Sequence, residues 1–110
     1  MPHLNFTSLV NEMIKAAKNS LESNWPAISA LATTSIRTIA HNFIDIEQMH
    51  IAGTISPEQA NLLVDMQLNA LRTILLSEKG LGLLAAEAAI NSVLDAVRTS
   101  VNAALGFALV

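Results

Sequence analysis

Hydrophobic positions recur every three or four residues along most of the chain, which is the spacing of one face of an α-helix. One stripe follows Phe6, Val10, Met13, Ala17 and Leu21, and a second follows Ile28, Ala32, Ile36, Ile39, Phe43 and Ile46. Pro26 lies between them and marks either the first turn of a new helix or a kink, because proline lacks an N–H and disfavours helix at the preceding residue. The phase of the stripe is nearly kept across Pro26, so we predict one long helix that is kinked or briefly broken there.

A clear boundary lies near the middle of the chain. Gly53 suits the left-handed position that ends a helix. Ser56 is a helix cap, Pro57 fits the first helical position, and Gln59 completes a capping box with Ser56. We therefore predict a single helical domain built of two arms, residues 4–52 and 57–107, joined by a turn at residues 53–56.

The second arm is the more apolar of the two. Over residues 57–78, hydrophobic side chains cover nearly the whole circumference of a helix, which is typical of a buried helix. Gly80 then marks a break or bend. Over residues 83–104 the polar side chains form one stripe, which faces either water or a polar seam between protomers: Glu87, Asn91, Asp95, Arg98 and Asn102.

The two arms allow two architectures. A straight arm of about 50 residues is roughly 75 Å long, so the chain either folds back at Pro26 and Gly80 into a compact four-helix bundle or stays long and pairs with other copies. The apolar circumference of residues 57–78 favours the second. We predict an all-α helical hairpin of three to four helices that forms a bundle through self-association, with another copy, or a different protein, as the burial partner.

The second arm supplies the residues that we expect at the contact between copies. They are Leu63, Met66, Ala70, Ile74, Ile90, Leu94, Val97, Val101 and Phe107. The tail at residues 105–110 carries no charged side chain, and we expect it to dock on a neighbouring helix or subunit. A groove on a different protein is the alternative partner for this tail.

Composition limits the classes of function. The chain is 52% hydrophobic and 14% charged, against about 25% charged residues in ordinary soluble proteins. Its six basic residues are dispersed along the chain, so we expect neither nucleic-acid binding nor attraction to anionic membranes. There is no cysteine for a disulfide framework or a thiolate metal site. The first six residues lack the basic and apolar regions of a secretory signal, so we expect a cytoplasmic location or a place in a larger assembly.

A membrane span is disfavoured. The longest segment without a charged residue, residues 23–36, contains Pro26, and a spanning helix needs about 18 or more apolar residues. Glu87, Asp95 and Arg98 interrupt the apolar C-terminal segment, where charged groups are expensive in a bilayer. A membrane-active helical protein remains a second alternative.

One pair of residues suits a metal. Glu47 and His50 are spaced as E-x-x-H, the ligand motif of ferritin-like bundles that bind iron. A site for iron or zinc also requires carboxylates from other helices, namely Glu12, Glu22 or Asp65. In the alternative interpretation, His50 ends an apolar stripe and Glu47 is a solvated flank.

No pattern indicates catalysis. The hydroxyl residues at 33–35 and Thr38 lack a paired base, and hydroxyls within helices commonly bond to their own backbone. His41 lies near Asn42 and Asp45, a grouping that usually means a local hydrogen bond at the surface. We expect no enzyme and no cofactor. The predicted function is a structural or scaffolding protein that self-assembles into a homo-oligomer or filament; the first alternative is a ferritin-like metal-binding oligomer that uses Glu47 and His50.

Overall fold

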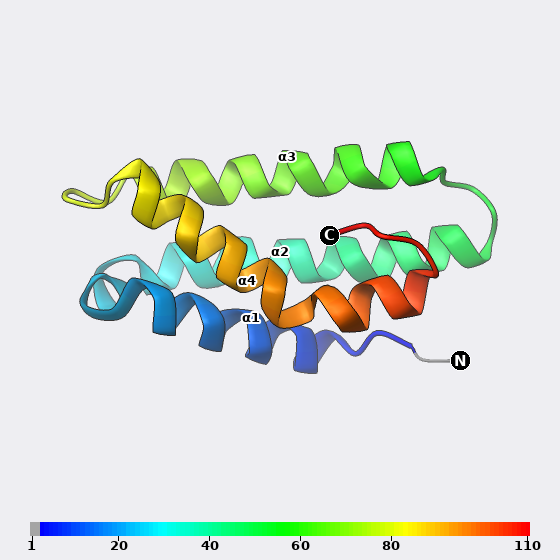
Figure 1. Ribbon diagram of the computed structural model, residues 1–110, viewed down its shortest axis with the longest axis horizontal. Coiled ribbons are helices and arrows are strands. Elements are labelled where there is room, and N and C mark those ends of the chain that lie inside the picture. Colours follow the sequence, from blue (N-terminus) through cyan, green and yellow to red (C-terminus); the bar gives the residue numbers. More distant parts are fainter. Residues whose placement is uncertain (1–2) are drawn as a thin grey trace.

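The computed structural model describes residues 3–110, and over these residues it contains four α-helices and no strand (Figure 1). The helices are α1 (Phe6–Leu21), α2 (Trp25–Ile51), α3 (Pro57–Leu76) and α4 (Leu83–Leu105), and a 3-10 turn, Glu22–Asn24, separates α1 from α2. The all-α class predicted from the hydrophobic spacing is confirmed. Residues 1 and 2, part of the segment inspected for a secretory signal, lie outside the described residues.

The chain folds back at each connection into one bundle. Its extents are 43 × 23 × 19 Å, which are too short for arms of roughly 75 Å. The compact alternative is therefore the observed one, and the preference for long arms is wrong. α1 packs most extensively on α4, and α2 packs on α3. In Figure 1, α4 starts beside the end of α3 and crosses obliquely to lie along α1.

The boundary at Pro26 differs from the prediction. α1 ends at Leu21, and Glu22 takes a positive φ of 50° that turns the chain before α2 begins. Pro26 lies in the first turn of α2, where a missing N–H leaves no helical bond unmade. The kinked long helix is thus wrong. Both stripes face the same core, so their shared phase carries no information on whether the helix is continuous.

The turn between α2 and α3 forms as predicted. The backbone N–H of Gln59 donates to the Ser56 hydroxyl at 3.1 Å, and the N–H of Ser56 donates to Oε1 of Gln59 at 2.9 Å. Gly53 has the expected positive φ, 73°. The capping box and the left-handed glycine are both confirmed, because each is fixed by residues within a few positions of the turn.

All four helices contribute to one hydrophobic core. Its largest fully buried side chain is Phe43, and Met13 and Ile36 are also fully buried. α3 buries a single face, while Leu62 and Met66 on the same helix stay exposed. The expectation that the whole circumference of residues 57–78 is buried is therefore not met within one chain.

The C-terminal tail docks on its own bundle. Gly106 ends α4 with φ 78°, and the chain turns back so that Leu109 is buried. The Asn102 side chain accepts from the N–H groups of Leu109 and Val110 at 2.9 and 3.1 Å, and it donates to the Val110 carbonyl at 2.9 Å. The tail thus docks on helices of its own chain, on α4 through Asn102 and on α2 through the contact of Phe107 with His50.

Candidate interaction surface

The residues predicted to join copies fall into three groups in the structure. Ile90, Val97 and Val101 are buried in the core of the single bundle, so they are not available for contact with a second copy. Their assignment to such a contact is corrected, because the apolar face of α4 is already covered by α1. Leu63, Ile74, Leu94 and Phe107 are half-buried, and Met66 and Ala70 are exposed.

Several large hydrophobic side chains remain exposed after the core is complete. Within residues 3–110 they are Leu31, Ile51, Leu62, Met66, Leu76, Leu83 and Leu84, with exposed fractions from 43% for Leu76 to 88% for Leu84. By their positions along the helices, Ile51 and Leu62 lie toward one end of the bundle and Met66 lies at the middle of α3. Leu31, Leu76, Leu83 and Leu84 lie toward the other end. We call these ends the α2–α3 end, where α2 connects to α3, and the α3–α4 end, where α3 connects to α4.

The α2–α3 end carries a hollowed apolar surface. Leu62 and Met66 lie one turn apart on the outer side of α3, exposed by 61% and 56%. Beside them is a recess of about 310 Å³, which we call the α2–α3 recess. All of its lining residues are uncharged: Met49, Thr54, Ile55, Gln59, Leu62 and Leu63. A second hollow of about 370 Å³ shares Met49 and Thr54 with it and reaches Asp45.

The α3–α4 end carries a protruding apolar surface. Leu83 and Leu84 are the first two residues of α4, and 58% and 88% of their surfaces are exposed. The connection before them is fixed by Leu81, which is buried, and by Gly80 at φ 92°. Leu84 therefore projects from a defined backbone, and we call Leu83 and Leu84 the leucine pair.

The two residues of the predicted metal pair, Glu47 and His50, lie in different environments. Glu47 is buried, and its Oε2 accepts a hydrogen bond from the N–H of Leu4 at 3.1 Å and lies 4.0 Å from Nδ1 of His3. His50 is exposed, with its ring edge-on to Phe107 at a centroid distance of 5.2 Å. The interpretation of Glu47 as a solvated flank is wrong, because the N-terminal segment covers it.

The structure does not gather further metal ligands around this pair. Within residues 3–110, no group of three or more His, Cys, Asp or Glu side chains is arranged to hold a metal ion. Within one chain, Glu12, Glu22 and Asp65 therefore do not join Glu47 and His50 in a group of metal ligands. The hydrogen bond between Glu47 and the backbone of Leu4 joins residues 43 positions apart. No local sequence pattern indicates such a contact, so it could not be predicted from the sequence.

The threonine hydroxyls singled out in the sequence make local contacts, whereas His41, expected to form a local hydrogen bond near Asn42 and Asp45, contacts α1 instead. The hydroxyls of Thr34 and Thr38 donate to the carbonyls of Ala30 and Thr34 at 3.1 and 3.2 Å, as expected of hydroxyls within a helix. The ring of His41 packs on Phe6 at a centroid distance of 4.2 Å. These contacts account for the three side chains as parts of the helix surface.

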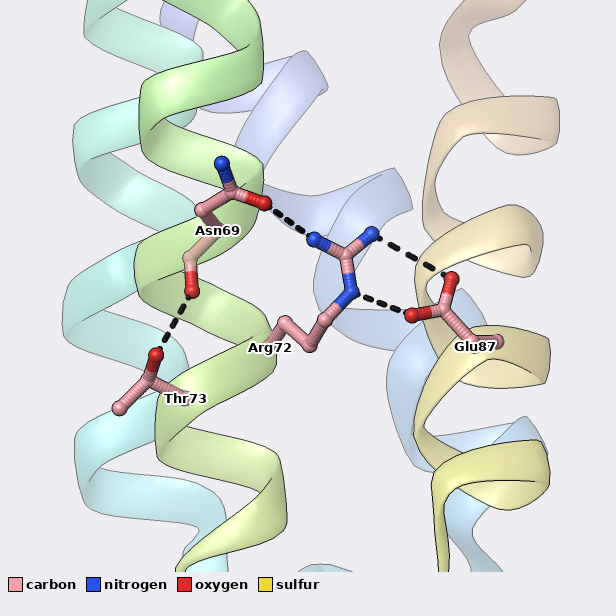
Figure 2. A network of polar contacts seen from close by, with 4 residues as sticks. All are labelled: Asn69, Arg72, Thr73 and Glu87. Carbon is pink, nitrogen blue, oxygen red and sulfur yellow. Dashed lines mark hydrogen bonds and ion pairs between the residues drawn. The ribbon is translucent and has the colours of Figure 1, made fainter.

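A polar network ties α3 to α4 (Figure 2). Arg72 on α3 donates to both carboxylate oxygens of Glu87 on α4 and also to the side chain of Asn69. Hydrogen bonding from Arg72 lowers the pKa of the Glu87 carboxyl, and the same contact raises the pKa of Arg72. Glu87 thus serves a contact between helices of one chain, while Asp95 pairs locally with Arg98.

Comparison of the chain with protein-family models, curated proteins and solved structures finds no match. Within residues 3–110, each helix is too short or too polar to cross a membrane. The most distinctive features of the described residues are the two exposed apolar surfaces.

The Arg72–Glu87 contact predicts a pH-dependent stability. The pKa of Glu87 is lowered from an ordinary value of 4.5 in the folded state, so its contribution is complete above that value and is lost as the pH falls through the lower, folded-state pKa. We expect the difference in unfolding free energy between wild type and Glu87→Gln to shrink from pH 6 to pH 3. Urea denaturation across this range measures it. In an Arg72→Gln background the difference should be independent of pH, and persistence of the full dependence there would contradict the assignment.

Proposed function

We propose that the protein is a structural or scaffolding component that assembles with copies of itself through apolar surfaces on the outside of its bundle. The observation that carries this proposal is the set of large hydrophobic side chains left exposed by a complete core, above all Leu84, Leu62 and Met66. Single exposed hydrophobic residues are normal, but grouped ones usually mark interfaces.

Energetics support this function. Fully burying a Leu or Met side chain contributes about 1.5–3 kcal/mol relative to leaving it in water. The leucine pair together with Leu62 and Met66 therefore offers a free-energy gain that the folded monomer does not use.

The absolute mass in solution tests the proposal. We expect light scattering behind a size-exclusion column to give several times 11.7 kDa for the wild type, with the mass falling gradually on dilution. Replacing Leu62, Met66, Leu83 and Leu84 together with serine should yield a monomer, because these side chains supply the exposed apolar area. Because these four side chains are exposed, replacing them leaves the core intact, and the helical circular dichroism signal should stay unchanged.

A matched variant distinguishes the apolar surfaces from α3 in general. Asn61→Ser/Asp65→Ser changes two exposed positions on the same helix, each next to one of the hydrophobic residues. It should assemble like the wild type. A wild-type mass of 11.7 kDa at every concentration would contradict the proposed function.

A further inference from the structure

The two exposed apolar surfaces differ in shape. At the α3–α4 end, the leucine pair is convex, with Leu84 88% exposed. At the α2–α3 end, the α2–α3 recess is a shallow, open hollow of about 310 Å³ that is lined wholly by uncharged residues. A protruding leucine fills a recess better than it packs against a second protruding leucine, so the shapes favour contact between unlike surfaces.

The two ends also differ in charge. We divide each helix at its middle and assign each connection to the end of the bundle where it lies. The half toward the α3–α4 end holds five of the six basic residues: Lys15, Lys18, Arg37, Arg72 and Lys79. It holds three of the nine acidic residues: Glu22, Glu78 and Glu87. The other half holds the remaining acidic residues and a single basic one, Arg98. The α3–α4 half is thus net positive and the α2–α3 half is strongly negative.

This charge separation favours contact between unlike ends of two copies over contact between like ends. Two α2–α3 ends brought together would place like charges opposite each other, and unlike ends would attract. Complementary potentials of this kind favour one register and suppress others. Asp45 lines the hollow that shares Met49 and Thr54 with the α2–α3 recess, so one acidic residue adjoins that surface.

We propose that copies of this chain join head to tail, with the leucine pair of one copy seated in the α2–α3 recess of the next. This inference rests on the proposed self-assembly and specifies its interface. The contact is heterologous, meaning that each copy offers two different surfaces. Such contacts build rings when the rotation between copies closes and open filaments when it does not.

Two double variants, each blocking one surface, test the inference. The recess variant is Leu62→Ser/Met66→Ser, which changes one lining residue of the recess and the exposed methionine one turn along α3. The leucine-pair variant is Leu83→Ser/Leu84→Ser. A head-to-tail contact needs one intact surface from each partner, so each variant alone should be a monomer of 11.7 kDa. A 1:1 mixture should form a heterodimer, because the recess variant keeps its leucine pair and the leucine-pair variant keeps its recess.

Light scattering of the two variants and of their mixture gives distinct results for the rival arrangements. If like surfaces joined, each variant would still form a dimer through its unblocked surface, and this would overturn the head-to-tail contact. Monomers in the mixture would also overturn it, since complementary surfaces must pair. If the wild type assembles but one of these two results is obtained, the head-to-tail contact is wrong and the proposed function still stands. If the wild type is a monomer, both proposals are wrong.

Discussion

Val97→Asp is expected to unfold the chain. Val97 lies on α4 with none of its surface exposed, so the aspartate carboxyl would enter the core without a partner. Losing the buried valine and burying an unpaired polar group together remove about 4 kcal/mol or more. That loss is comparable to the whole stability of a domain, about 5–15 kcal/mol. Circular dichroism should show loss of helix at pH 7.

A neighbouring position provides the control for this substitution. Ala96 precedes Val97 on α4 and is exposed, so Ala96→Asp introduces the same carboxyl into water and should lower the unfolding free energy by less than about 1 kcal/mol. A folded Val97→Asp that has only lost its assembly would place Val97 between copies, as the hydrophobic pattern first indicated, and would contradict its place in the core of a single bundle.

Phe43→Ala is expected to destabilise the bundle by about 3–5 kcal/mol, because it removes a large side chain and leaves a cavity that the surroundings only partly fill. Phe43 lies on α2 and is fully buried. Urea denaturation at one fixed protein concentration measures the loss as a lower midpoint with a nearly unchanged slope.

Phe107 offers the same chemical change in a different environment. Phe107 lies in the C-terminal tail, and its half-buried ring packs against His50 of α2. Phe107→Ala should therefore destabilise the protein less than Phe43→Ala does. Equal effects would mean that the tail contributes as much to stability as the centre of the core.

The sequence predicted those parts of the fold that depend on neighbouring residues. The capping box at Ser56 and Gln59 and the helix end at Gly53 involve side chains a few positions apart, so their geometry follows from local chemistry. The stripes on α1 and α2 were predicted for the same reason, since helical spacing alone decides which residues share a face.

Properties that depend on the distances between helices were not predictable in this way. Whether the chain turns or bends at Pro26 depends on how α1 packs against α2 and α4, and the hydrophobic spacing is the same in both cases. Val97 and Leu84 are both apolar residues of α4, yet one is buried and the other exposed. Glu47 is buried because a segment more than 40 positions away in the sequence folds over it.

The packing of α1 on α4 has a consequence for how the protein is made. The most extensive contact between helices joins the first helix to the last, and contacts between residues far apart in the chain form slowly because a long loop must close first. While a ribosome is still synthesising residues 83–105, α1 can pack only on α2, and the part of its inner face that contacts α4 has no cover. The nascent chain thus presents apolar surface until α4 emerges, and the core of the bundle cannot be completed before then.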